Sequence, residues 1–259
     1  MPIRQMIKIN KDYIDIPRSL DDKCHARPAI TTNCRRRELI SAGKYIDNNK
    51  YNSRYKRNDI KEKLTDLYHH KCAFCETRVE QLHVEHYRPK TYYYWLAYSW
   101  DNLLLACPTC NECKGQKFDV KTKKAVYSLT VDKKINKLGR IYDRIEHPLL
   151  VNPEAIDPEL YLTYDETGAM YSTEPCFIWT IDACNLNRTY LKDERRKILN
   201  EIKHKVNQRK FVYKNNKKEL KTAIKNIVED FKLETGDQYA YAGFRRYALR
   251  NLLKKLLAS

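Results

Sequence analysis

Two Cys-x2-Cys pairs constrain the fold of this chain more than any other feature of its sequence. They are Cys72–Cys75 and Cys107–Cys110, and 31 residues separate the two pairs. Each spacing places two thiolates on one side of a tight turn, and two such pairs complete a tetrahedral zinc site. Because four thiolates leave no open position on the metal, the spacing predicts a structural zinc rather than a catalytic one. We therefore expect a zinc-stapled module with a hairpin-sized insert.

The other cysteines and nearby histidines leave alternatives open. Cys113 follows the last pair by three residues and is a competing ligand, and His69 and His70 lie just before the first pair. Chance occurrence of two such pairs in one chain is improbable, so zinc is preferred over unrelated buried thiols. The cysteines without a paired spacing are expected to be small apolar core residues; they are Cys24, Cys34, Cys176 and Cys184.

Composition favours an anionic partner and excludes several classes of protein. Fifty Lys and Arg against 33 Asp and Glu give a net charge of +17, which attracts polyanions such as nucleic acid. A merely basic, Lys-rich protein is the alternative interpretation. The sequence has no apolar run of about 18 residues for a membrane span. The charged first residues lack the apolar run of a signal peptide, which predicts a cytoplasmic protein. The odd count of nine cysteines then argues against a disulfide framework. The sequence has no GxxxxGK[ST] motif, so we expect no P-loop.

Changes in residue composition and hydrophobic periodicity along the sequence predict four regions. Residues 1–70 are an N-terminal, partly helical region, and residues 71–125 are the cysteine-bearing module. Residues 126–190 are a loop and strand extension, and residues 191–259 are a basic helical region.

Hydrophobic periodicity and turn residues predict the elements within these regions. QLHVEHYR at 81–88 alternates like a strand, and DETG at 165–168 predicts the turn of a hairpin. The expected helices are 35–48, 54–70, 186–210, 217–233 and 238–258.

The insert between the cysteine pairs carries side chains suited to phosphodiester hydrolysis. His86 is a suitable base for activating water, because a neutral imidazole has a pKa near neutrality. Glu85 precedes it directly, and Asn111 follows the last zinc cysteine. Both supply oxygens of the kind that hold a hard divalent cation. His83 lies on the opposite face of a regular strand from His86 and is the second choice of base.

The order of these motifs resembles the zinc-bearing HNH endonucleases, also called ββα-metal nucleases. The resemblance implies an α+β fold, with a zinc-stapled ββα-metal HNH module between helical N- and C-terminal flanks. It also implies catalytic roles: His86 is the general base, and Asn102 supports the loop that carries it. Glu85 and Asn111 are then the ligands of a catalytic Mg²⁺ or Mn²⁺. Glu85 stands where Asp is usual and Asn111 where His is usual, and both keep oxygen ligands.

Further side chains around these motifs are candidates for contact with nucleic acid. Arg88, Lys90 and Lys114 are expected to hold the phosphate backbone, with ordinary surface charge as the alternative. The aromatic run YYYWLAYSW at 92–100 is expected to pack internally or against a partner rather than stack on bases.

Longer motifs narrow the resemblance to one group of HNH proteins. KCAFCE, HVEHYRPK, WDNLLLACPTCN and PLLVNPEAIDPE resemble the PtuB-type HNH subunits of Septu anti-phage systems, and similar proteins accompany some retrons. The resemblance covers roughly residues 6–200. It implies a defence nuclease that cleaves nucleic acid, with DNA favoured, and that works with a PtuA-like SMC/ABC ATPase. A retron RNA/DNA–reverse transcriptase complex is a further implied partner. The alternatives are an RNA nuclease acting on tRNA, and a non-catalytic zinc subunit.

The C-terminal region is expected to divide its contacts. Residues 191–232 carry 14 Lys and Arg against 6 Asp and Glu, which favours contact with nucleic acid. Leucines recur at helical spacing over residues 239–257, which favours docking to a partner protein. Packing of that apolar face onto the chain's own core is the alternative.

Overall fold

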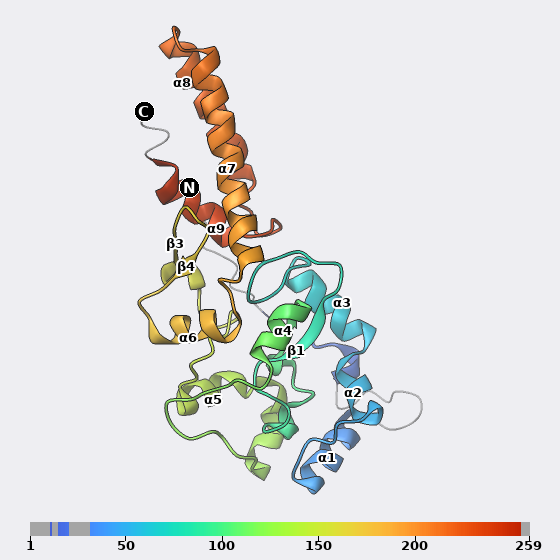
Figure 1. Ribbon diagram of the computed structural model, residues 1–259. Coiled ribbons are helices and arrows are strands. Elements are labelled where there is room, and N and C mark those ends of the chain that lie inside the picture. The colour runs from blue at the N-terminus through green and yellow to red at the C-terminus, as the bar shows by residue number, and fades with distance from the viewer. Residues whose placement is uncertain (1–10, 12–14, 21–31, 255–259) are drawn as a thin grey trace.

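The computed structural model describes residue 11 and residues 15–20 and 32–254. These residues form helices around two separate two-stranded sheets, and a pair of long helices projects from one end of the body. Figure 1 places the N-terminal helices and the first sheet in the lower half and the projecting pair at the top. The α+β class expected from the sequence is confirmed. Cys24 lies outside the described residues.

Three helices form the N-terminal part of the body: α1 (Thr32–Ala42), α2 (Asn49–Tyr55) and α3 (Asn58–Leu67). Ile60 and Leu64 are one turn apart on α3, and both are fully buried. They cover the first sheet, because α3 packs against both of its strands. The helix expected over 35–48 corresponds to α1, which ends at Ala42. The helix expected over 54–70 corresponds to α3, and the separate short helix α2 precedes it.

The central module has a ββα order. β1 (His83–His86) pairs antiparallel with β2 (Leu103–Ala106), and α4 (Pro108–Lys114) follows directly. All of β2 is buried, which suits its unbroken apolar sequence, although this strand is not among the expected elements. Opposite residues in the ladder include His86 and Leu103, so the catalytic candidate lies where β1 ends.

The aromatic run between β1 and β2 fills the core of the module. Tyr93, Tyr98 and Trp100 are fully buried, and Trp95 is 2% exposed. The indole N–H of Trp95 donates to the hydroxyl of Tyr142 on α5 (Gly139–Glu146), 3.2 Å away. The expectation of packing rather than base stacking is thus confirmed for these buried residues, whereas Tyr92 is 44% exposed.

A second sheet and a short helix lead into the C-terminal region. β3 (Thr163–Tyr164) and β4 (Met170–Tyr171) form the hairpin expected around 165–168. Gly168 has a φ of +81°, and a Cβ there would lie 2.3 Å from the Lys192 carbonyl, so the turn requires glycine. α6 (Pro175–Ala183) packs against β4.

Two long helices form the projecting pair, which we name the arm. α7 (Thr189–Val212) and α8 (Lys217–Leu233) pack against each other, and the second has the bounds that the sequence predicts. At 1.5 Å per residue, α7 is about 36 Å long.

The C-terminal helix is shorter than expected. α9 (Ala242–Tyr247) is followed by one π-helical turn at Ala248–Leu252, and these elements pack against β3 and α8. Phe244 and Leu253 are each 1% exposed, so the chain's own core covers the apolar face. The prediction that this face docks a partner is therefore wrong for the described residues. The last leucines of the pattern, at 256 and 257, lie outside them.

In the described part of the chain, no helix has both the length and the apolar character needed to cross a bilayer.

Candidate active site and metal centre

Four sulfur atoms meet as the paired spacing predicts. The Sγ atoms of Cys72, Cys75, Cys107 and Cys110 all lie within 4.8 Å of one another, and all four residues are buried. Sulfurs held tetrahedrally at about 2.3 Å from zinc lie about 3.8 Å apart, and Cys75 and Cys107 are separated by 3.8 Å. The cluster therefore fits a zinc site with four thiolate ligands.

Local structure brings the second cysteine pair into position. Cys107 is the N-cap of α4, and its sulfur accepts the backbone N–H of Cys110 at 3.4 Å. Pro108 occupies the first helical position, where its missing N–H costs nothing. The first pair is tied to the sheet, because the N–H of Ala73 donates to the Leu105 carbonyl on β2 at 2.8 Å.

An arginine directly before the arm contacts three of the four sulfurs. Nη1 of Arg188 lies 3.5 Å from the sulfur of Cys110, and Nη2 lies 3.8 Å from those of Cys75 and Cys107. Four thiolates around Zn²⁺ carry a net charge of −2, which a guanidinium partly offsets. Arg188 precedes the first residue of α7, so it joins the metal centre to the root of the arm.

The remaining cysteines take different places. Cys113 is partly exposed on α4 and lies outside the four-sulfur cluster. Cys184 is fully buried, as expected for a small core residue. Cys34 is exposed and Cys176 partly exposed, so the core prediction is wrong for Cys34. The side chain of Cys34 lies on the exposed face of α1, whereas Arg36 and Leu39 lie on the buried face.

A cleft of about 580 Å³ opens beside the metal centre and gathers the predicted catalytic groups. His86 and Glu85 line it from β1, and Asn111 lines it from α4. His83 lines it as well and is exposed, so it stays available as the second choice of base. Asn102 does not line the cleft; it lies behind, in the core.

His86 is held in one orientation at the wall of the cleft. Its Nε2 lies 2.9 Å from the Ala97 carbonyl, and its ring meets that of Tyr55 edge-on at 4.5 Å. Because a carbonyl oxygen only accepts, Nε2 carries the proton of the neutral ring and Nδ1 keeps a free lone pair. Burial lowers the pKa of His86 to about 3, so the ring is neutral at physiological pH.

Glu85 is paired with a buried lysine. Nζ of Lys114 lies 2.7 Å from Oε1 of Glu85 and 2.8 Å from the backbone carbonyl of His86. The Lys114 side chain is fully buried, whereas that of Glu85 keeps 9% of its surface exposed. The expectation that Lys114 contacts nucleic acid is therefore wrong, because its ammonium group is directed into the protein and bound there.

Asn102 fixes the backbone two residues beyond His86. Its Oδ1 accepts from the Arg88 N–H at 2.8 Å, and its Nδ2 donates to the carbonyls of Arg88 at 3.1 Å and Leu96 at 3.3 Å. These bonds tie together the two ends of the segment between β1 and β2. The geometry suits the supporting role that the resemblance implies for Asn102.

Arg88 does not face the cleft. Its side chain is 1% exposed and forms ion pairs with Asp143 at 2.6 Å and Glu146 at 2.8 Å. Glu146 is itself fully buried, so the pair ties α5 to the end of β1. The prediction of a phosphate contact is wrong for Arg88, because both carboxylates already bind its guanidinium.

Three residues were predicted to contact the phosphate backbone of nucleic acid, and of these Lys90 lines the cleft. Its Nζ donates to the hydroxyl of Tyr55 at 2.7 Å and lies over the rings of Tyr45 and Tyr55. Lys56 and Lys61 line the same cleft and were not singled out from the sequence. The cleft therefore presents three lysines, Lys56, Lys61 and Lys90.

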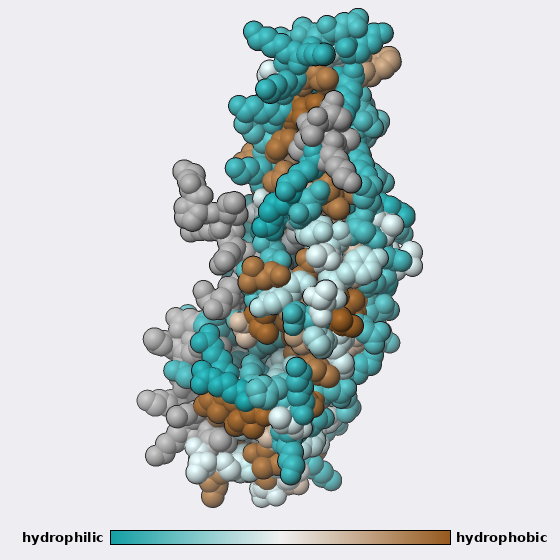
Figure 2. All heavy atoms as spheres, turned by 90° about the vertical axis from the view of Figure 1, so that its left-hand side faces the viewer, coloured by the Kyte–Doolittle hydropathy of each residue, from teal (hydrophilic) through white to brown (hydrophobic). Residues whose placement is uncertain are grey.

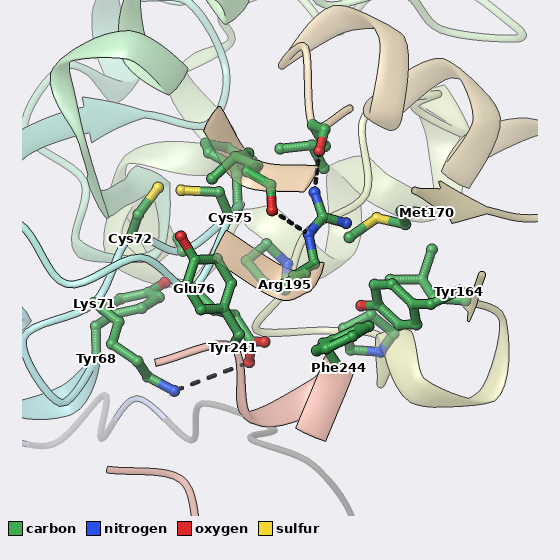
Figure 3. A pocket seen from close by; sticks show the side chains of 17 residues that line it. Tyr68, Lys71, Cys72, Cys75, Glu76, Tyr164, Met170, Arg195, Tyr241 and Phe244 are labelled. Atoms are coloured by element: carbon green, nitrogen blue, oxygen red, sulfur yellow. Dashed lines mark hydrogen bonds and ion pairs between the residues drawn. The ribbon is translucent and has the colours of Figure 1, made fainter. Parts of the chain in front are cut away.

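A second, smaller cavity of about 70 Å³ is lined by Cys72 and Cys75. Figure 3 shows Cys72 and Cys75 at its edge, with Arg195 and Phe244 across from them. Lys71 faces Glu76 there at 3.9 Å. The volume is of the order of a few water molecules, so the larger cleft is the candidate active site.

Sequence reasoning missed the contacts made over long separations. Arg188 reaches sulfurs 78 to 113 residues away, and Lys114 reaches Glu85 across 29 residues. No spacing rule connects such pairs, since the fold alone brings them together.

Comparison with known proteins finds a family model and relatives that match parts of this chain. A family model described as HNH endonuclease matches residues 71–117. The Septu protein PtuB of Bacillus mycoides (strain KBAB4) is 29% identical over 170 residues, which are 58% of this chain and 54% of that protein. The Septu protein PtuB of Bacillus thuringiensis is 40% identical over 60 residues, or 22% of this chain and 23% of that protein.

A protein with a different name also matches. The Septu protein PtuA of Bacillus mycoides (strain KBAB4) is 31% identical over 165 residues, which are 58% of this chain and 22% of that protein. The chain thus spans about a fifth of the matched PtuA and about half of the matched B. mycoides PtuB. Residues 71–117 form an HNH endonuclease domain, in a chain homologous to the Septu proteins PtuA and PtuB.

Proposed function

We propose that this chain is a metal-dependent nuclease of anti-phage defence that hydrolyses phosphodiester bonds in nucleic acid, with DNA the favoured substrate. One observation carries the proposal: a single cleft on the HNH domain gathers His86, Glu85 and Asn111 from β1 and α4. Similarity to Septu proteins supports the defence role.

His86 acts as the general base in this proposal. With its Nε2–H held by the Ala97 carbonyl, its Nδ1 takes a proton from water as the water oxygen bonds to phosphorus. The bond from phosphorus to the 3′-oxygen breaks, and that oxygen receives a proton from solvent. The products are a 5′-phosphate and a 3′-hydroxyl. Asn102 contributes by positioning the backbone beside His86, and Lys90 faces the phosphate backbone.

Glu85 and Asn111 fit a divalent cation by their chemistry, since each offers an oxygen to the same cleft. Bound to these two side chains, Mg²⁺ or Mn²⁺ would supply positive charge to stabilise the departing 3′-oxygen. Lys114 offsets the charge of Glu85, so the two protein ligands together bring little net negative charge. The phosphate of the substrate then supplies the missing negative charge, and we expect tight metal binding to require nucleic acid.

The chain also needs a partner that binds ATP if it acts as part of a Septu-like system. Its sequence holds no GxxxxGK[ST] motif, and its relatives carry the names PtuA and PtuB. We propose that it assembles with a PtuA-like ATPase. A retron RNA/DNA–reverse transcriptase complex stays a further predicted partner.

The test is a cleavage assay on the purified chain, alone and with a PtuA-like ATPase, in Mg²⁺ with duplex DNA, single-stranded DNA and total RNA. We expect DNA products from the unsubstituted protein and a loss of at least about 10²-fold in Glu85→Gln. Glu80→Gln is the matched control, because Glu80 is exposed and lies outside the cleft.

The outcomes separate the alternatives. Cleavage of RNA alone moves the substrate to RNA, with tRNA as the first molecule to examine. A folded, zinc-loaded protein that binds nucleic acid and cleaves none of the three substrates overturns the nuclease and leaves the non-catalytic zinc subunit. Melting temperature and zinc content distinguish loss of chemistry from loss of fold in Glu85→Gln.

A further inference from the structure

The far end of the arm concentrates positive charge. We name residues 205–221 the arm tip; they comprise the end of α7, the connecting loop and the start of α8. The tip holds seven Lys and Arg and one acidic residue, Glu219. Its cations are Lys205, Arg209, Lys210, Lys214, Lys217, Lys218 and Lys221.

Two cations nearer the root of the arm are paired within the protein. Arg196 pairs with Asp193 at 2.6 Å, and Lys203 pairs with Glu166 at 2.7 Å. Among the residues that the structure describes, by contrast, six tip cations take part in no ion pair; they are Lys205, Arg209, Lys214, Lys217, Lys218 and Lys221. All six are exposed. Within the described part of the chain, the tip therefore presents exposed cations without a carboxylate partner, whereas two cations nearer the root of the arm are paired.

The start of α8 carries charge of the sign that helix stability disfavours. Lys217 and Lys218 are its first two residues, where the helix dipole is positive and acidic residues are stabilising. The cap itself is conventional, since the Asn216 side chain accepts from the Glu219 N–H at 3.1 Å. Glu219 in the same turn offsets one of these charges, so the start of α8 stays positive, which favours contact with an anion.

The composition of the tip surface suits a phosphate backbone. Figure 2 shows the upper end of the molecule, where the arm lies, covered largely by hydrophilic side chains. Phe211 lies among the cations and is 79% exposed. An exposed ring beside Lys and Arg is a common arrangement on nucleic-acid surfaces, where cations meet phosphates and rings meet bases.

We propose that the arm tip is a second nucleic-acid contact, separate from the catalytic cleft, which binds the phosphate backbone of the same substrate. This inference rests on the proposed nuclease function for the identity of the partner. α7 alone has about the length of ten base pairs of duplex. The tip therefore engages long substrates, whereas a duplex of a few base pairs reaches the cleft alone.

The test compares two variants with equal loss of charge. The tip variant replaces Arg209, Lys214, Lys217 and Lys218 by Gln. The control replaces four exposed cations outside the arm by Gln: Arg37, Lys44, Lys121 and Lys123. Binding to a non-cleavable 40-base-pair phosphorothioate duplex, and to a folded RNA of similar charge, is followed by fluorescence anisotropy over a range of salt concentrations.

We expect the tip variant to bind about 10- to 100-fold more weakly at low salt. The slope of log K against log salt should become shallower by about 3 to 4, because four phosphate contacts are lost. The control should change binding less than about threefold, and both variants should keep the original melting temperature. Cleavage of an 8-base-pair duplex should be the same in the tip variant as in the unsubstituted protein.

A tip variant with unchanged affinity and salt slope overturns the inference, whatever the protein cleaves. So does a variant that loses binding only to phosphatidylglycerol vesicles or to the PtuA-like ATPase, because the tip then serves a membrane or a protein. Failure of the proposed function is a different result: the unsubstituted protein binds through the tip and cleaves no substrate. Comparison of the affinities for the duplex and for the folded RNA shows which nucleic acid the tip prefers.

Discussion

At the level of single residues, buried charges beside β1 are matched in pairs. Lys114 meets Glu85, and Arg88 meets Glu146, with at least one fully buried side chain in each pair. Removing one partner of such a pair leaves an uncompensated charge, which typically costs about 3–5 kcal/mol. Arg88 and Lys114 are therefore part of the structure that holds β1 against α4 and α5. Sequence alone shows their charge but not their partners.

A pH dependence of stability is expected from Asp101. Burial raises its pKa from 3.8 to about 6, although the Gly139 N–H bonds its carboxylate. The folded state therefore binds this proton more tightly than the unfolded chain, so the group favours folding as pH falls from about 6 towards 4. The shift of about 2 units corresponds to about 3 kcal/mol.

Asp101→Asn removes that titration. Between pH 4 and pH 7, the unfolding free energy of the variant should rise relative to that of the unsubstituted protein by up to about 3 kcal/mol. Urea unfolding at a series of pH values measures the difference. Parallel profiles for the two proteins would contradict the raised pKa of Asp101.

Arg188 should control how firmly the four thiolates hold zinc. Arg188→Met removes a guanidinium within 3.5–3.8 Å of three sulfurs. Loss of a group that contacts metal ligands typically costs about 10- to 100-fold in metal affinity. Zinc transfer to a chromogenic chelator should be faster by a comparable factor, with partial rescue in Arg188→Lys. Arg196→Met, on the exposed side of α7, is the control and should release zinc at the original rate.

At the level of elements, sequence periodicity predicted helix bounds correctly where interactions within the helix determine them. The bounds of α8 match the prediction, because it is an exposed amphipathic helix with an Asn216 cap. The predicted helix over 238–258 breaks down instead. Tyr241 takes a left-handed conformation, with φ at +55°, just before α9. Tertiary contacts decide this break, since the N–H of Gly243 donates to Glu76, far away in the sequence.

Phe244 should anchor α9 to the body. It is 1% exposed and meets the ring of Tyr164 on β3 at a centroid distance of 5.3 Å. Phe244→Ala should lower the unfolding free energy by about 3–5 kcal/mol, whereas Leu233→Ala, at a residue 74% exposed, should change it by less than about 0.5 kcal/mol. Chemical denaturation checks both, and equal effects would show that α9 does not pack as described.

At the scale of the whole molecule, the metal centre connects parts that are distant in sequence. One cysteine pair precedes β1, the other begins α4, and Arg188 brings in the arm. Zinc removal should therefore unfold the module rather than one turn, since structural zinc contributes on the order of 10 kcal/mol.

Metal analysis should find about one zinc per chain in the unsubstituted protein. Cys72→Ser should lose it and melt at a markedly lower temperature. Cys113→Ser should keep it, because Cys113 lies outside the sulfur cluster. Zinc loss in both variants would make Cys113 a ligand and revise the assignment of the cluster.

The candidate site was predictable where it depends on short spacings. The zinc cysteines, and Glu85, His86 and Asn111, follow from motifs a few residues long, and the structure brings them to one metal cluster and one cleft. The exposure of the predicted site residues was not predictable from the sequence. Arg88, for example, is buried through contacts with α5, which lies about 55 residues further along the chain. Sequence patterns thus indicated the chemistry of the site better than its surroundings.

The central claim is that His86 is the general base of a nuclease, and His86→Ala tests it most directly. The rate of duplex DNA cleavage in saturating Mg²⁺ is measured for His86→Ala, for His83→Ala and for the unsubstituted protein. We predict a loss of about 10²- to 10⁴-fold in His86→Ala, with zinc content unchanged, and near-normal cleavage in His83→Ala. An active His86→Ala protein, or an inactive His83→Ala protein that stays folded, would contradict the account.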